Sequence, residues 1–231
     1  MTKNFLNLIF LFLVGIFGGI LGSQILWPYF VEKPLFSQYR LERNPVFIVE
    51  KKEIKTGEKD VLPESVAKVE KSVLAIETGK GKKGSALILT SDGLVLTLAD
   101  LADPKAKIFF EKEILPFQII KKDLKENLAL LKIEKKDLPS CGFADLTKKR
   151  LGERVFLVSG LFQEGTVKKM VDEGIIRSLD SESFETNIVK RPEISGSSLF
   201  DLEGNLLGIA VLKEEKVSFI PVQKIKSFSG F

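Results

Sequence analysis

The chain has 231 residues, 44% of them hydrophobic and 29% charged, so a packed core can form and global disorder is excluded. Its net charge of +4 comes from interleaved charges of both signs, which does not predict nucleic-acid binding. One cysteine and no histidine exclude an internal disulfide, argue against a metal site or other cofactor, and remove the usual near-neutral general base.

Residues 4–31 carry no charge, and residues 5–27 are strongly apolar. About 20 such residues span a bilayer as a helix. We therefore expect residues 1–31 to form an uncleaved transmembrane anchor, with a cleaved signal peptide as the alternative. The few flanking lysines and arginines mildly favour a cytoplasmic C-terminus.

Residues 32–62 are polar and interrupted by prolines, which is typical of a stalk or linker, and one short strand is expected at 46–49. The next segment, 63–71, starts with Pro63 and Glu64 and carries its lysines late, so it predicts a short helix. A folded domain is expected over residues 63–231.

From Ser72 onward, short apolar runs alternate with turn residues such as those at 91–93, Ser-Asp-Gly. This spacing predicts an all-β sandwich or a pair of barrels and no parallel α/β sheet. The expected strands lie at 73–76, 85–89, 94–97, 107–110, 117–121, 128–133, 154–159, 165–171, 174–178, 183–187, 198–201, 206–212 and 218–221.

Several motifs occur in a familiar order along these strands. They are the Gly-Ser-Ala-Leu-Ile-Leu run that starts at 84, Asn-Leu-Ala-Leu-Leu-Lys-Ile at 127–133, Gly-Ile-Ile-Arg-Ser at 174–178, Ser-Gly-Ser-Ser-Leu at 195–199, Gly-Asn-Leu-Leu-Gly-Ile at 204–209 and Ser-Phe-Ile-Pro at 218–221. Together they resemble the HtrA/Deg-type trypsin-like serine proteases. The resemblance implies two packed, six-stranded antiparallel Greek-key barrels with the site in the cleft between them. The family often carries a C-terminal PDZ domain, and with Phe231 as the last residue we expect none here.

The resemblance places Ser195 at the position of the catalytic serine, but the other site positions differ from the family. Asp100 stands where the family has its catalytic histidine, and Asn127 stands where it has its aspartate. Glu126 is a poor substitute, since neighbouring strand residues point to opposite faces. Glu193 replaces an oxyanion-hole glycine, where glycine would reach the required backbone geometry more easily.

No other side chain is an obvious base for Ser195. A carboxylate with a pKa near 4 accepts a hydroxyl proton poorly at neutral pH. Lys132 and Lys190 could be imagined in a Ser–Lys dyad, but nothing in their spacing supports it. We read Cys141 as a packed loop residue and the lysines of residues 79–84 as a solvated hairpin loop.

These departures predict a protein that is not an enzyme: a membrane-anchored pseudoprotease at the cell envelope that binds a peptide or protein partner in the cleft or on the barrel surface. The family resemblance places the barrels outside the cytoplasm, against the mild charge bias. Two alternatives stay open. Ser195 is the nucleophile of an active hydrolase with a non-standard base, or the domain is a structural module that forms homo-oligomers.

Overall fold

The computed structural model describes residues 2–26, 58–180, 183–213 and 216–231, and the chain divides into two compact units, Met1–Ile54 and Lys55–Phe231. In the first unit, helix α1 covers Thr2–Leu21 and a π-helical segment, η1, covers Gly22–Leu26. Among the described residues, no helix combines the length and apolar character that crossing a membrane requires, so the predicted anchor is not supported. Residues 27–57, with the strand expected at 46–49, lie outside the described residues.

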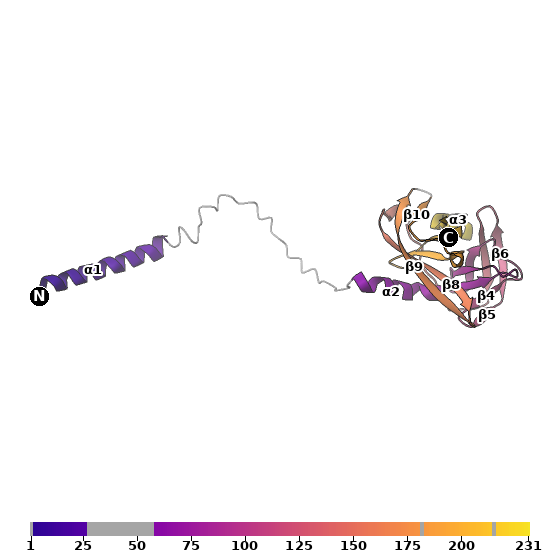
Figure 1. The fold of residues 1–231 in the computed structure, drawn as a ribbon, viewed down its shortest axis with the longest axis horizontal. Helices are drawn as coiled ribbons and strands as arrows, with labels where there is room; N and C mark the ends of the chain where they lie inside the picture. Colours follow the sequence, from indigo (N-terminus) through magenta and orange to yellow (C-terminus); the bar gives the residue numbers. More distant parts are fainter. Residues whose placement is uncertain (1, 27–57, 181–182, 214–215) are drawn as a thin grey trace. The chain divides into compact units, whose positions relative to one another are not determined.

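The second unit begins with helix α2, Glu58–Val69, and a 3₁₀ turn, η4, Glu70–Ser72 (Figure 1). The helix starts before the expected residue and has Pro63 inside it. Packing explains this start, because Leu62 and Val66 lie against the core and Val69 is buried in it. The Ser65 hydroxyl also donates to the carbonyl of Leu202 and ties this helix to the β domain.

Strands β1–β13 and a C-terminal helix, α3, follow (Figure 1). Their bounds are β1 Val73–Glu77, β2 Lys83–Ile88, β3 Leu94–Leu98, β4 Lys107–Phe110, β5 Glu113–Leu115, β6 Phe117–Asp123, β7 Leu128–Ile133, β8 Arg154–Gln163, β9 Thr166–Leu179, β10 Phe184–Thr186, β11 Ser198–Asp201, β12 Leu206–Leu212, β13 Val217–Pro221 and α3 Val222–Ser229.

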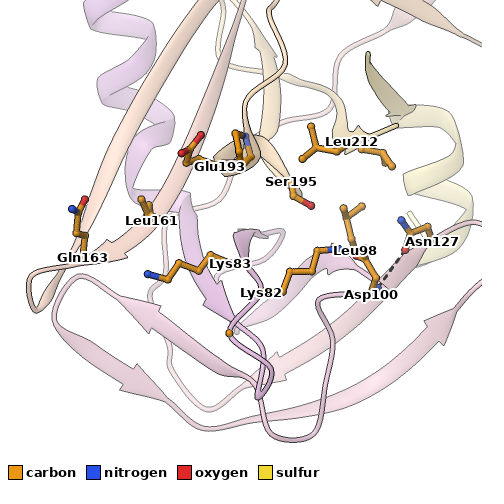
Figure 2. A pocket seen from close by; sticks show the side chains of 13 residues that line it. Lys82, Lys83, Leu98, Asp100, Asn127, Leu161, Gln163, Glu193, Ser195 and Leu212 are labelled. Atoms are coloured by element: carbon orange, nitrogen blue, oxygen red, sulfur yellow. Dashed lines mark hydrogen bonds and ion pairs between the residues drawn. The ribbon is translucent and has the colours of Figure 1, made fainter. Parts of the chain in front are cut away.

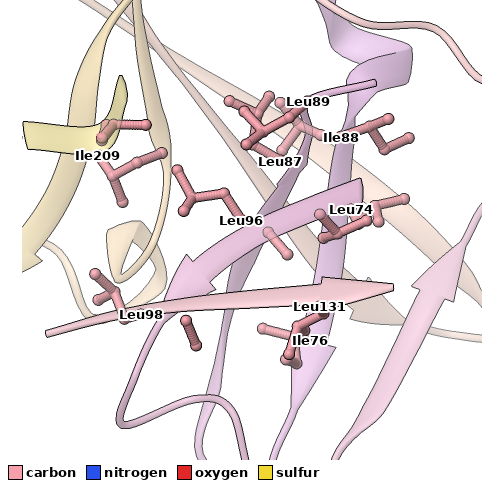
Figure 3. Packing of buried hydrophobic residues seen from close by; sticks show 14 of the residues in the cluster. Leu74, Ile76, Leu87, Ile88, Leu89, Leu96, Leu98, Leu131 and Ile209 are labelled. Carbon is pink, nitrogen blue, oxygen red and sulfur yellow. The ribbon is translucent and has the colours of Figure 1, made fainter. Parts of the chain in front are cut away.

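The first half of these strands forms a seven-stranded sheet in the order β5-β4-β1-β2-β3-β7-β6, with antiparallel neighbours. Leucine and isoleucine side chains from its strands pack into one buried cluster. Figure 3 shows Leu74, Leu87, Leu96 and Leu131 in this cluster together with Ile209, which comes from the other sheet. The two sheets therefore share part of their core.

The second half forms a six-stranded antiparallel sheet in the order β10-β9-β8-β11-β12-β13. Its own apolar cluster includes Leu157, Ile176 and Leu199, each at most 1% exposed. Strand β8 also packs against β1, and there Gly160 is required, since a Cβ atom would lie 2.6 Å from the carbonyl oxygen of Leu74. Gly160 thus allows β8 of the second sheet to pack closely against β1 of the first sheet.

The all-β prediction of two antiparallel sheets is confirmed, with differences in detail. The first sheet has seven strands instead of six, because residues 113–115 form the additional strand β5. The strands expected at 165–171 and 174–178 are one strand, β9, because Asp172 and Glu173 continue the pairing with β8. The C-terminal helix α3 was not expected from the sequence.

Lys169, on β9, is a half-buried lysine whose ammonium donates to the carbonyl of Val73 at the start of β1. Burial lowers its pKa from 10.5 to about 8, although Glu70 and Glu111 act in the opposite direction. The folded protein therefore binds fewer protons than the unfolded chain between pH 8 and pH 10.5, so its stability should rise with pH across that window.

We expect Lys169→Met to lack this rise, which amounts to at most about 3 kcal/mol in the free energy of unfolding. Urea unfolding of both proteins from pH 8 to pH 10.5 measures it, and the comparison removes the contribution of the other lysines. Parallel stability curves for the two proteins would contradict the assignment.

Candidate active site

Ser195 lies in the bend between a short 3₁₀ helix, η6, Pro192–Ile194, and strand β11. Gly196 has a φ of 76°, which lets the chain turn directly after Ser195. Its N–H donates to the carbonyl of Ala210 at 2.9 Å, and the Ser197 N–H donates to the carbonyl of Ile194 at 3.0 Å. These bonds fix the bend against β12, so Ser195 is held by a rigid part of the second sheet.

The Ser195 side chain enters a cavity of about 710 Å³ between the two sheets (Figure 2). The lining residues come from β2 and β3 of one sheet, from β8 and β12 of the other, and from the turns between strands. They are Gly81, Lys82, Lys83, Leu98, Asp100, Asn127, Leu161, Gln163, Pro192, Glu193, Ser195, Val211 and Leu212. Ser195 is 3% exposed, and within the described part of the chain its hydroxyl has no hydrogen-bond partner.

Asp100 and Asn127 both line this cavity, as the resemblance predicts. Asn127 has a φ of 53°, a left-handed conformation that asparagine tolerates better than most residues. Its side-chain oxygen accepts the N–H of Asp100 at 3.3 Å, and its carbonyl accepts the N–H of Ala99 at 3.2 Å. Asn127 thus orients the loop that carries Asp100, but it brings no charge to the site.

Glu126 lies outside the cavity lining and pairs with Lys224 at 3.3 Å. The expected reason, alternation along a strand, does not apply, because Glu126 and Asn127 both lie in the turn between β6 and β7. The strained geometry expected at Glu193 is not observed. Glu193 lies inside η6, and the non-glycine residues with positive φ in the described chain are Glu111, Asn127, Asp137 and Glu164. A 3₁₀ turn uses ordinary right-handed angles, which glutamate adopts without strain. What Glu193 changes is the charge of the cavity wall.

Lys82 is the site residue that sequence reasoning missed. It directly precedes β2, lines the cavity, and forms an ion pair with Asp100. Figure 2 shows Ser195 and Lys82 entering the cavity from opposite walls. An amine therefore lies beside the carboxylate at the histidine position. The only signal in the sequence was the lysine-rich loop at 79–84, and nothing in it indicated which lysine reaches the site.

The other candidate groups lie elsewhere. Lys132 donates to the Asp92 carboxylate at 2.6 Å, and neither Lys132 nor Lys190 is among the residues that line the cavity. Burial raises the pKa of the Cys141 thiol to about 12, which keeps it in the unreactive thiol form. Among the residues that the structure describes, no group of three or more His, Cys, Asp or Glu side chains could hold a metal ion.

Two antiparallel barrel-like sheets with a serine bend in the cleft between them define a trypsin-like fold. A family model described as "Trypsin-like peptidase domain" matches residues 80–209, more than half of the chain. The solved structure of Deg5 matches with a TM-score of 0.66 over 76% of this chain and 95% of that one, at 18% identity, which shows the fold.

The sequence relatives are named "Probable periplasmic serine endoprotease DegP-like". The protein from Hahella chejuensis is 32% identical over 134 residues, 54% of this chain and 29% of that protein. The protein from Pseudomonas fulva is 32% identical over 138 residues, 54% of this chain and 28% of that protein. This chain thus spans less than a third of the length of these relatives, and it belongs to the HtrA/Deg-type trypsin-like serine protease family.

These relatives contradict one prediction. The missing histidine predicted a protein that is not an enzyme, whereas the relatives are named as serine endoproteases, which points to protease activity. The prediction weighed a carboxylate, Lys132 and Lys190 as replacement bases and dismissed each of them. It did not consider a lysine that reaches the histidine position from the preceding loop.

Proposed function

We propose that this chain binds an extended polypeptide in the cleft and cleaves it as a serine endopeptidase, with Ser195 as the nucleophile. The observation that carries the proposal is the arrangement of Ser195, Lys82 and Asp100 around one cavity. The names of the relatives support both the endopeptidase activity and a location of the domain outside the cytoplasm.

The cavity wall suits a polypeptide. Leu98, Leu161, Val211 and Leu212 offer apolar contacts for side chains, and Gln163 adds an amide that can donate or accept a hydrogen bond. A polypeptide partner therefore fits this cleft better than a small metabolite.

The Lys82–Asp100 pair takes the place of the family's imidazole in this proposal. Because Lys82 is an ammonium in its ion pair with Asp100, it first releases a proton to water, and the neutral amine then accepts the proton of the Ser195 hydroxyl while the oxygen attacks the peptide carbonyl carbon. The proton then passes from Lys82 to the departing amine, so the peptide C–N bond breaks and an acyl ester remains on Ser195. Water hydrolyses this ester by the same proton path. Asp100 orients the amine between these steps.

Lys82→Met tests the base directly. We expect it to lower the rate of Ser195-dependent cleavage of an unfolded protein substrate by about 10²- to 10⁴-fold, the usual contribution of a general base. Lys83→Met is the matched control, because Lys83 lines the same cavity without pairing with Asp100, and its rate should stay close to wild type. Equal rates for wild type and Lys82→Met would remove Lys82 from the mechanism.

A further inference from the structure

Behind Ser195 lies a group of buried hydroxyl side chains that the proposed reaction does not use. We call Ser85, Thr97, Ser159 and Ser197 the hydroxyl cluster, and each of them is 0% exposed. Ser85 and Thr97 belong to β2 and β3 of the first sheet, Ser159 belongs to β8, and Ser197 directly precedes β11. The cluster therefore lies where the two sheets meet beneath the cleft.

Ser85 makes most of the connections. Its N–H donates to the carbonyl of Ser195 at 2.9 Å, so it holds the nucleophile residue by its backbone. Its hydroxyl oxygen accepts the N–H of Gly160 at 2.9 Å and lies 3.3 Å from the Ser197 hydroxyl. Its carbonyl accepts the hydroxyl of Thr97 at 2.9 Å. Ser85 thus contacts the bend at 195–197, strand β8 and strand β3.

Ser197 completes the network from the other side. Its hydroxyl donates to the hydroxyl of Ser159 at 2.7 Å, which links the Ser195 bend to β8. Buried hydroxyls with partners fix a geometry strongly, because breaking one bond leaves a polar group without water.

We propose that Ser85 is a positioning residue for Ser195. Its hydroxyl locks the first sheet to β8 and to Ser197, and its backbone N–H then fixes the Ser195 carbonyl and, with it, the direction in which the Ser195 side chain enters the cleft. A displacement of about 1 Å of the attacking oxygen slows its attack on a carbonyl carbon. The hydrogen bonds of Ser85, which connect the two sheets beside Ser195, therefore affect the reactivity of Ser195.

The proposal rests on the proposed function only in taking Ser195 as the reacting group, and the test separates the two. Ser85→Ala removes the hydroxyl and leaves the N–H that holds Ser195. Ser198→Ala is the matched control: Ser198 is equally buried beside the same bend, but its hydroxyl has no hydrogen-bond partner in the described structure. Ser197→Ala is a second test variant in case Ser85→Ala does not fold.

The first measurement is amide hydrogen exchange of residues 194–198 in the full chain, which does not depend on catalysis. We expect Ser85→Ala and Ser197→Ala to exchange about tenfold faster there than wild type, the loss expected for one buried hydrogen bond, and Ser198→Ala to match wild type. Equal exchange in Ser85→Ala and Ser198→Ala would overturn the positioning role.

The second measurement is phosphonylation of Ser195 by a fluorophosphonate. Ser85→Ala should lower the maximal labelling rate about tenfold and leave the concentration for half-maximal rate unchanged, because reactivity is affected and cleft binding is not. A change confined to the half-maximal concentration would also overturn the role. If wild type is not labelled at all, the proposed function fails while the exchange measurement still decides the role of Ser85.

Discussion

The double variant Asp100→His/Asn127→Asp is expected to cleave polypeptides about 10³-fold faster than wild type at pH 7, because an imidazole is largely neutral there and accepts a proton directly, whereas a lysine held in an ion pair is charged and must first lose a proton. Asn127 already accepts the N–H of Asp100 with its side-chain oxygen, and aspartate at 127 can make the same bond while adding the missing charge. The left-handed φ of 53° at this position is also tolerated by aspartate. We therefore expect both new side chains to fit the existing backbone conformation at positions 100 and 127.

Cleavage of an unfolded protein substrate by wild type and the double variant measures this gain. The same two changes combined with Ser195→Ala form the control, because the gain must disappear with the nucleophile. Adding Glu193→Gly should raise the rate further by removing a negative charge from the wall where an oxyanion develops. No gain in a folded double variant would mean that Asp100 and Ser195 do not face the same reacting atom.

Gly196→Ala is expected to destabilise the fold by about 3 kcal/mol and to abolish labelling of Ser195. Two costs combine here. The φ of 76° is costly for alanine, and the new Cβ would overlap the carbonyl oxygen of Ser85 and lie 3.1 Å from a methyl of Leu101. The overlap is with backbone, so the Ser195 bend itself has to move.

Gly152→Ala is the control for strain alone. Gly152 has a similar φ of 84°, but a Cβ there would meet nothing within 4 Å. We expect it to cost about 1 kcal/mol and to leave Ser195 labelling unchanged. Chemical unfolding and a fluorophosphonate assay of both variants compare the two positions. A similar loss of stability and labelling in both would show that backbone strain, and not the contact with Ser85, governs the bend.

Most of the strands could be predicted because apolar and polar residues alternate between clear turn signals, as around Gly93. Strand β5 was missed since Glu113, Ile114 and Leu115 are half-buried or exposed and give no alternation. The two strands expected at 165–171 and 174–178 left out Asp172 and Glu173, yet both continue the pairing with β8. Consecutive charged residues inside a strand resemble a turn in the sequence.

Only the site residues that belong to sequence motifs could be predicted. The motifs around Ser195, Asp100 and Asn127 placed these residues in one cleft, and the structure brings them together. Lys82 was not predictable in the same way, because its contact with Asp100 depends on how the turn between β1 and β2 folds over the cavity. Side chains that reach a site from a loop have no fixed spacing to the residues they meet.

Intact-mass analysis of the full chain after incubation with a fluorophosphonate tests whether Ser195 is an active nucleophile, with Ser195→Ala treated in parallel. We expect a single phosphonyl adduct on wild type that maps to Ser195 and is absent from the variant. An unmodified wild-type protein, or an adduct that persists in Ser195→Ala, would contradict the assignment of Ser195 as an active nucleophile.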